Sequence, residues 1–141
     1  MLGASDTFLA IKVAIICVFY SESEFIPDIS ACSNGPAAII AARIYRFYDQ
    51  AGFMHGKEKD AYLNEAIQIY GWLRKHLFDA STGAVRDNMN KTGRVDPAVY
   101  TYNQGTFIGA AHELYLITGD RQYLEDAVKA GYYVIKEMTK A

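Results

Sequence analysis

The sequence predicts an all-α fold built from two helical hairpins that stack side by side. In four segments, apolar residues recur at the three- and four-residue steps of a helix. The pattern Tyr-Leu-x-x-Ala at 62–66 also returns at 123–127, 61 residues later. Because a single hairpin cannot bury all its apolar surface, such repeats stack on one another, and further neighbours are expected beyond these two.

The first segment of the chain, residues 1–30, is of unclear origin. Phe8 to Tyr20 is strongly apolar, is interrupted by Lys12, and is too short to cross a bilayer. A secretory signal normally has basic residues before its apolar core, whereas residues 1–7 carry only Asp6. We interpret the segment as a buried helix or strand, with a signal peptide as the alternative.

The first predicted hairpin follows a polar connection at 21–33. Asn34-Gly35-Pro36 is expected to open a helix that runs to Tyr48, since proline suits a first helical turn. Ile40, Ile44 and Phe47 form one apolar stripe of this helix, and alanines form a second, small face that lets a neighbour approach closely. A loop at 49–59 leads to a second helix at about 60–78.

The second predicted hairpin follows a long polar segment at 79–97, which contains turns or short strands around Thr82-Gly83 and Thr92-Gly93. Its helices are expected at about 104–117 and 121–138. Gly119 is placed to end the first of them.

Composition excludes several classes of function. The net charge is −2 and no basic stripe occurs, which excludes nucleic acid as a partner. Cys17 and Cys32 make neither a disulfide framework nor, with three scattered histidines, a metal site. We therefore expect no metal and no cofactor.

Polar and aromatic residues gather where the helices begin. The run Tyr100-Thr101-Tyr102-Asn103-Gln104 precedes the third helix, and Asn34 has the equivalent place before the first. Tyrosine rings stack on sugars, and amides pair with hydroxyls, so a binding face is one interpretation. The other is that Asn103 simply caps its helix.

Carboxylates for acid–base chemistry are few. Asp87, between Arg86 and Asn88, is the best single candidate, and we expect Arg86 to hold it ionised. Asp96 precedes a proline and is expected to shape a turn. Glu113 is expected on a solvated helix face.

Four motifs resemble glycoside hydrolase family 76, the endo-α-1,6-mannanases. They are Cys-Ser-Asn-Gly-Pro-Ala-Ala-Ile-Ile-Ala-Ala-Arg-Ile-Tyr at 32–45, Tyr-Leu-x-x-Ala-x-x-Ile-Tyr-x-Trp-Leu at 62–73, Thr-Tyr-Asn-Gln-Gly-Thr-Phe-Ile-Gly-Ala-Ala at 101–111 and Leu-Tyr-x-x-Thr-Gly-Asp-x-x-Tyr-Leu at 114–124. The resemblance implies an (α/α)6 toroid, of which residues 31–141 would form the C-terminal part.

The resemblance also implies retaining hydrolysis of α-1,6-mannosidic bonds by two adjacent aspartates. No Asp-Asp dipeptide occurs in the chain, so no catalytic residue is assigned. The matched positions expected to line the substrate groove are Asn34, Asp87, Tyr102, Asn103 and Gln104. The residues themselves do not indicate a compartment, and the resemblance implies a secreted, cell-surface or periplasmic location.

The leading hypothesis is thus a mannan-directed, glycoside hydrolase-like chain that binds substrate but lacks the catalytic pair. The partner would be a mannose-containing polysaccharide or oligosaccharide, and an oligomer or a missing portion would complete the ring. The alternative is a non-catalytic helical module that binds a glycan or a protein. A purely structural array of tetratricopeptide type fits the repeat length less well.

Overall fold

The computed structural model describes residues 29–52 and 57–139, and in this part of the chain the fold is two stacked helical hairpins. The elements are β1 (Ile29–Ser30), α2 (Ala31–Ala51), α3 (Lys57–His76), β2 (Asn88–Met89), α4 (Thr101–Thr118), α5 (Arg121–Tyr133) and the π-helix η1 (Val134–Met138). The apolar segment Phe8 to Tyr20 and most of the predicted connection at 21–33 lie outside the described residues.

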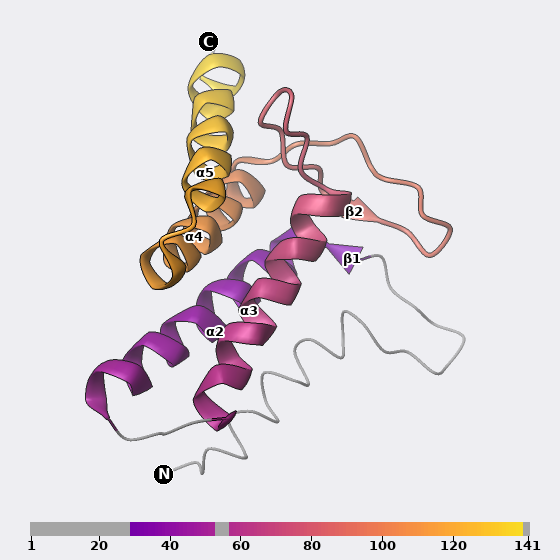
Figure 1. Ribbon diagram of the computed structural model, residues 1–141. Helices are drawn as coiled ribbons and strands as arrows, with labels where there is room; N and C mark the ends of the chain where they lie inside the picture. Colours follow the sequence, from indigo (N-terminus) through magenta and orange to yellow (C-terminus); the bar gives the residue numbers. More distant parts are fainter. Residues whose placement is uncertain (1–28, 53–56, 140–141) are drawn as a thin grey trace.

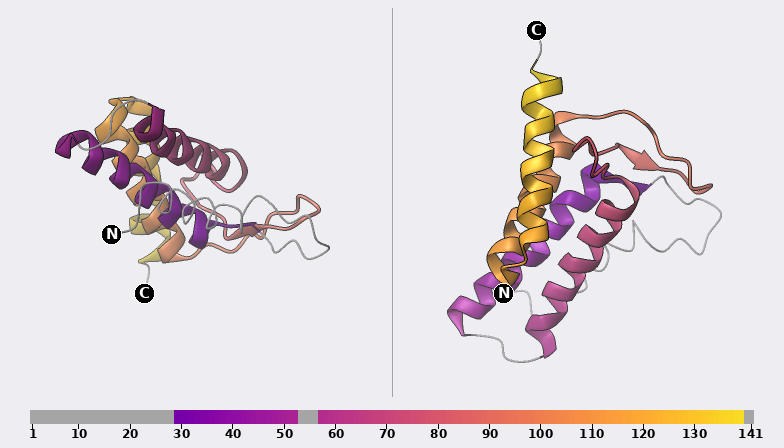
Figure 2. Two further views of the ribbon diagram at one scale, coloured as in Figure 1. Left: turned by 90° about the horizontal axis from the view of Figure 1, so that it is seen from below. Right: turned by 45° about the horizontal axis from the view of Figure 1, so that its top comes forward.

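The two hairpins lie against each other with α2 and α4 in contact at the centre. Figure 1 shows α3 beside α2, and α5 running along α4 toward the C-terminus. The second view in Figure 2 shows the α4–α5 pair crossing the α2–α3 pair, while the segment between α3 and α4 extends to one side. This arrangement confirms the predicted all-α fold.

The starts of α2 and α4 are separated by the same number of residues as two matching glycines of the sequence repeat. α2 begins at Ala31 and α4 at Thr101, which is the 70-residue offset that also separates Gly35 from Gly105. α2 and α4 each end at a glycine in the left-handed conformation, Gly52 with φ 67° and Gly119 with φ 71°. The backbone N–H of each glycine bonds a carbonyl of the preceding turn, which is how such helix ends satisfy their free acceptors.

The predicted start of the first helix at Asn34-Gly35-Pro36 was wrong. Ser30 caps α2 and accepts a hydrogen bond from the Cys32 N–H, so Pro36 lies inside the helix rather than at its opening. The helix begins earlier because Ala31 N also donates to the Asp87 carbonyl at 2.7 Å. That partner is 56 residues away in sequence, so no local signal could indicate it.

The core is built from small residues between α2 and α4, as the alanine face predicted. Ala38, Ala41 and Ala42 are fully buried, and Ala110 and Ala111 lie opposite on α4. Two larger rings, Tyr70 and Phe107, stack at 5.0 Å between α3 and α4. The apolar stripe of α2, in contrast, faces outward: Ile40 and Phe47 are 52% and 61% exposed.

Two buried carboxylates tie the hairpins together. Glu113 on α4 accepts from Arg43 at 2.8 Å and from Arg46 at 2.6 Å, both on α2. Asp126 on α5 is fully buried and accepts from Tyr70 at 2.9 Å and from Arg74 at 2.6 Å, both on α3.

The expectation that Glu113 lies on a solvated face was therefore wrong. Its partners come from another hairpin, and a buried carboxylate is tolerated only when it is paired in this way.

The long segment between the hairpins folds into turns. Gly83 and Gly93 take positive φ angles of 87° and 82°, and the chain pairs back on itself at Phe78 with Val85 and at Met89 with Val95. The predicted turns at these two glycines are confirmed. β2 also pairs antiparallel with β1, which carries Asp87 to the start of α2.

Candidate binding site around Asp87

The starts of α2 and α4 meet beside Asp87. In β1 and β2, Ser30 lies opposite Asn88, and the Ala31 N–H bonds the Asp87 carbonyl. Gly35 of α2 lies so close to Thr106 of α4 that a Cβ there would be 2.4 Å from the Thr106 hydroxyl oxygen. The strand pairing and this close approach therefore place the beginnings of two helices, 70 residues apart in sequence, on one side of the molecule.

The Asp87 carboxylate is held by two amides. Asn103 Nδ2, in the first turn of α4, donates to Asp87 Oδ1 at 2.8 Å, and Asn88 Nδ2 donates to Oδ2 at 2.9 Å. Asp87 remains half-buried, so solvent still reaches it. Each carboxylate oxygen can accept more than one hydrogen bond, and the group is left able to accept from a ligand hydroxyl.

Asn103 does not cap its helix. The N-cap of α4 is Tyr100, whose side chain makes no capping bond, while Asn103 lies buried three residues further on. Its Oδ1 is buried without a hydrogen-bond partner among the described residues. The interpretation of Asn103 as a helix cap is therefore wrong, and its amide instead holds Asp87.

Arg86 does not pair with Asp87, contrary to expectation. Its Nη1 donates to the Pro97 carbonyl at 2.8 Å, and its Nη2 lies 4.0 Å from the Asp79 carboxylate. Neighbouring residues of an extended segment point to opposite sides, which is why sequence adjacency was misleading. The Asp87 carboxylate is thus surrounded by neutral amides rather than by a guanidinium.

Two tyrosines form an aromatic surface beside this carboxylate. Tyr100 and Tyr102 stack with ring centroids 5.2 Å apart and an interplanar angle of 6°, and they are 44% and 52% exposed. Loss of solvent around the ring raises the pKa of the Tyr102 hydroxyl, and the nearby charge of Asp87 raises it further. The Tyr102 hydroxyl therefore stays protonated at neutral pH and can donate to a ligand oxygen.

The other two predicted site residues lie deeper. Asn34 is buried, and its Nδ2 donates to the Ser30 carbonyl at 2.7 Å. Gln104 is fully buried: its Oε1 accepts from Val85 N, and its Nε2 donates to the carbonyls of Gly83 at 3.0 Å and Ala130 at 3.1 Å.

The structure therefore brings Asp87, Tyr102 and Asn103 together, with Asn88 and Tyr100 as additional members. We call these five residues the Asp87 cluster. Asn34 and Gln104 hold the surrounding backbone. Gln104 joins three separate segments, an arrangement for which a single polar residue in a sequence provides no signal.

Metal ligands are not grouped in the described residues. Within 29–52 and 57–139 no three His, Cys, Asp or Glu side chains lie together as a metal site would require. No helix in these two ranges is long and apolar enough to cross a bilayer. Cys32 is an exposed free thiol that accepts a hydrogen bond from the Ser30 hydroxyl at 3.0 Å.

Comparison with known proteins identifies the family. The sequence model of the glycosyl hydrolase family 76 matches residues 29–141 of this chain. The chain belongs to glycosyl hydrolase family 76. The family 76 resemblance of the four sequence motifs is thereby confirmed. None of the curated proteins matches the chain.

Solved structures of family 76 proteins are similar to this chain. One is an inactive variant of the α-1,6-mannanase GH76A of Salegentibacter sp. HEL1_6, with two neighbouring aspartates replaced by alanine, in complex with α-1,6-mannotetrose. It is 37% identical with a TM-score of 0.71, over 84% of this chain and 34% of that chain. Another structure of GH76A is 32% identical with a TM-score of 0.77, over 97% of this chain and 42% of that one.

A third similar structure is the Lin0763 protein from Listeria innocua. It is 28% identical with a TM-score of 0.75, over 96% of this chain and 39% of that chain. The family 76 chain described here thus spans between about a third and two-fifths of the length of these solved chains.

Proposed function

We propose that this chain binds α-1,6-mannan at the Asp87 cluster and forms a substrate-holding part of a glycoside hydrolase. The observation that carries the proposal is the Asp87 carboxylate, held by the amides of Asn103 and Asn88 beside the stacked rings of Tyr100 and Tyr102. A carboxylate that accepts from hydroxyls and an exposed aromatic face are the two groups that a sugar ring requires.

Membership of the family supports mannan as the ligand. The similar GH76A structures were obtained with α-1,6-mannotetrose and with α-1,6-mannotriose. In both of these inactive variants two neighbouring aspartates are replaced, and the present chain has no Asp-Asp dipeptide. We therefore propose that the chain binds the glycan and does not hydrolyse it alone.

Calorimetric titration of the 141-residue chain with α-1,6-mannotetraose tests the binding site. Asp87→Asn keeps the shape of the side chain but removes its charge. We expect it to lower affinity about tenfold, as for a lost hydrogen bond to a charged group. Asp60→Asn makes the same change at an exposed position of α3 and should leave affinity unchanged.

Two results would contradict the proposal. Equal affinity of the wild type and Asp87→Asn for α-1,6-mannotetraose would show that the Asp87 cluster does not bind the glycan. Release of reducing ends from α-1,6-mannan by the purified chain would show that its catalytic groups are present after all. Far-UV circular dichroism of each variant establishes that the helices are intact.

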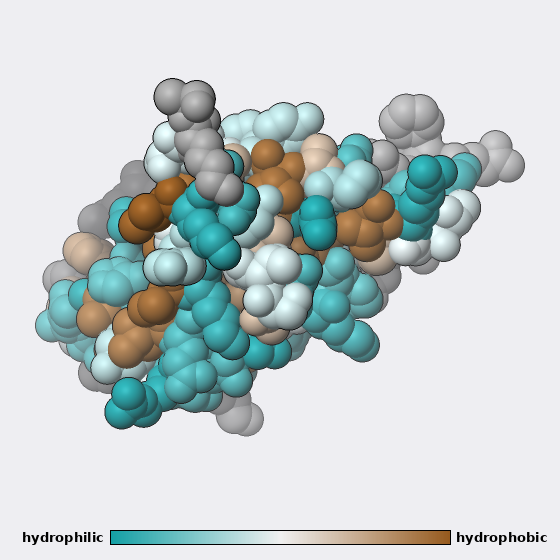
Figure 3. Space-filling view, turned by 90° about the horizontal axis from the view of Figure 1, so that it is seen from above, coloured by the Kyte–Doolittle hydropathy of each residue, from teal (hydrophilic) through white to brown (hydrophobic). Residues whose placement is uncertain are grey.

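A second candidate function, self-association through helix faces, is favoured by a separate observation. Val128, Tyr132 and Ile135 follow one another at helical spacing along α5 and η1 and are 61%, 65% and 68% exposed. Seen from above, the molecule shows separate hydrophobic areas between hydrophilic ones (Figure 3). Runs of large exposed apolar residues normally mark a contact surface.

The repeat indicates that the exposed helix faces pack against another helical hairpin of the same type. Gly35 receives Thr106 of the next hairpin, whereas nothing among the described residues lies within 4 Å of a Cβ placed on the equivalent Gly105. We propose that a second copy of this chain stacks against the open face next to Gly105 and so continues the stack of hairpins. Sedimentation equilibrium tests it, because one copy has a mass of 15.7 kDa.

A further inference from the structure

A polar hollow of about 370 Å³ lies in the β-hairpin next to Asp87, between the segments 88–90 and 94–97. We call it the hairpin hollow. Its volume is within the range of about 300–1,000 Å³ that is usual for small-molecule sites. It is lined by Asn88, Asn90, Arg94, Val95, Asp96 and Pro97.

The walls of the hollow are held in place before any ligand binds. Asn90 Oδ1 accepts from Thr92 N at 3.0 Å, from Thr92 Oγ1 at 2.8 Å and from Arg94 N at 2.9 Å. Asn90 N donates to the Arg94 carbonyl at 3.0 Å, and Asp96 N donates to the Asn88 carbonyl at 2.9 Å. These five hydrogen bonds hold the backbone of both arms of the hairpin in place before binding.

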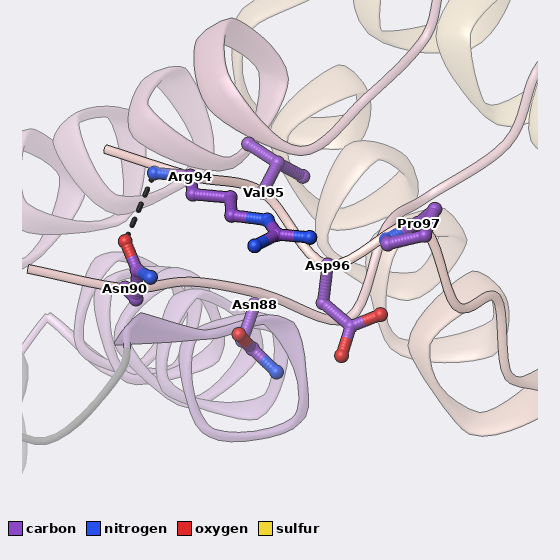
Figure 4. Close-up of a pocket in the computed structure, with 6 residues that line it drawn as sticks. All are labelled: Asn88, Asn90, Arg94, Val95, Asp96 and Pro97. Atoms are coloured by element: carbon purple, nitrogen blue, oxygen red, sulfur yellow. Dashed lines mark hydrogen bonds between the residues drawn. The ribbon is translucent and has the colours of Figure 1, made fainter. Parts of the chain in front are cut away.

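The polar groups that face the hollow have unused hydrogen-bonding capacity. Figure 4 shows the Arg94 side chain extending along the hairpin toward Asp96, with the Asn88 amide nearby. Within residues 29–52 and 57–139, the Arg94 guanidinium has neither a hydrogen bond nor an ion pair. Asp96 uses one carboxylate oxygen to accept from Ala98 N at 2.9 Å, which leaves the other for a ligand.

The chemistry of these groups favours a neutral, hydroxyl-rich ligand. Arg94 and Asn90 Nδ2 offer donors, and Asp96 and Asn88 Oδ1 offer acceptors, which suits hydroxyls that donate and accept at once. One positive and one negative side chain leave the hollow without the excess positive charge that a phosphate or carboxylate would need. Val95 and Pro97 add an apolar edge for the C–H face of a pyranose.

The hollow and the Asp87 cluster share one residue, Asn88. The Asn88 side chain lines the hollow and also donates to Asp87 Oδ2 at 2.9 Å. Asn88 therefore links the carboxylate of the Asp87 cluster to the wall of the hollow.

We propose that the hairpin hollow is a second sugar site, which takes a further mannosyl unit of the same linear α-1,6-mannan chain. This inference rests on the proposed function of the Asp87 cluster. In this proposal Arg94 and Asp96 bind the additional unit and so favour longer oligomers over shorter ones. Arg94 is the principal donor, since its guanidinium is the largest unpaired polar group of the hollow.

The experiment compares α-1,6-mannobiose with α-1,6-mannotetraose in calorimetric titrations of the 141-residue chain. Arg94→Ala should lower affinity for the tetraose about tenfold, as for a lost charged hydrogen bond, and leave affinity for the biose unchanged. Lys91→Ala removes a positive charge from the exposed turn of the same hairpin, outside the hollow, and should change neither. Asp87→Asn should weaken both ligands.

The possible failures are distinguishable. If Arg94→Ala leaves tetraose binding intact, or weakens both oligomers equally while Asp87→Asn still reduces affinity, the hairpin hollow is not a second site and the proposed function stands. If the folded wild-type chain binds neither oligomer, the proposed function itself fails, and this inference fails with it. If Arg94→Ala and Lys91→Ala weaken the tetraose alike, general charge explains the effect and the inference is overturned.

Discussion

The ionisation of Glu113 is directly tied to the packing of the two hairpins. Burial alone would raise the pKa of its carboxyl, but the hydrogen bonds and charges of Arg43 and Arg46 outweigh burial, and the net pKa lies below the ordinary value of 4.5. A carboxyl whose pKa is lower in the folded state stabilises the fold above its unfolded pKa. This stabilisation is lost as the pH falls through the folded pKa.

Glu113→Gln should therefore destabilise the chain in a pH-dependent way. At neutral pH we expect a loss of about 1–2 kcal/mol in the free energy of unfolding, moderated because Arg43 is largely exposed. The difference between variant and wild type should shrink as the pH falls through the lowered pKa of Glu113, because the wild-type carboxyl then becomes protonated. Urea unfolding followed by circular dichroism across this pH range measures it.

Glu125→Gln is the matched control, because Glu125 is exposed on α5 and its substitution removes the same charge. It should leave the free energy of unfolding within about 0.5 kcal/mol of wild type at every pH. A constant difference between Glu113→Gln and wild type from neutral to acid pH would show that the Arg43 and Arg46 pairs do not depend on the ionised carboxylate.

At the scale of elements, the contact between the starts of α2 and α4 sets the geometry of the Asp87 cluster. A Cβ on Gly35 would lie 2.4 Å from Thr106 Oγ1 and 2.7 Å from Thr106 Cβ. The Thr106 hydroxyl is itself tied to the Tyr102 carbonyl at 3.0 Å and the Asn103 carbonyl at 3.2 Å. A displacement of Thr106 would therefore be passed on to the residues beside Asp87.

Gly35→Ala should destabilise the chain by about 1–3 kcal/mol through overpacking and should also weaken mannotetraose binding. Gly105→Ala is the same substitution at the equivalent position of α4, where no described residue lies within 4 Å of the added Cβ. In the single-copy chain it should stabilise the fold by up to about 1 kcal/mol, since alanine is the better helix former. Thermal unfolding measures both variants, and destabilisation of equal size at the two positions would contradict the proposed close approach.

The elements themselves were largely predictable from the sequence, because helix period and repeat are local patterns. The 70-residue offset between Gly35 and Gly105 is also the offset between the observed helix starts. The long-range side-chain contacts of the site and of the hairpin packing were not predictable from the residues alone. Arg86 bonds Pro97 rather than Asp87, and Glu113 finds partners about 70 residues away.

In the candidate site, the family motif at 101–111 contains Tyr102 and Asn103, which lie near Asp87, but it did not indicate the depth of each side chain. Gln104 belongs to the motif at 101–111 and is nevertheless fully buried. Arg94 lies in none of the motifs, and its unpaired guanidinium became evident only from the hairpin that surrounds it. Burial and unused hydrogen bonds are properties of packing, and a linear pattern does not contain them.

At the scale of the whole molecule, the two hairpins leave apolar helix faces exposed, on which further hairpins could stack. α5 and η1 expose Val128, Tyr132 and Ile135, and α2 exposes Ile40 and Phe47. In a head-to-tail contact the outer face of one copy would cover the first helix of the next, and each copy would leave an open face for another. The similar solved structures are more than twice as long as this chain, which is consistent with additional hairpins beside these two.

If copies of the chain stack in this way, the wild type should sediment as species heavier than 15.7 kDa at high concentration. Ile135→Glu should shift it to the single-copy mass, because a buried unpaired carboxylate would be introduced at the contact. Gln68→Glu adds the same charge at an exposed position of α3, outside α2, α5 and η1, and should leave the mass distribution unchanged. A single-copy mass for the wild type at all concentrations would contradict self-association and leave these faces without a second copy as their partner.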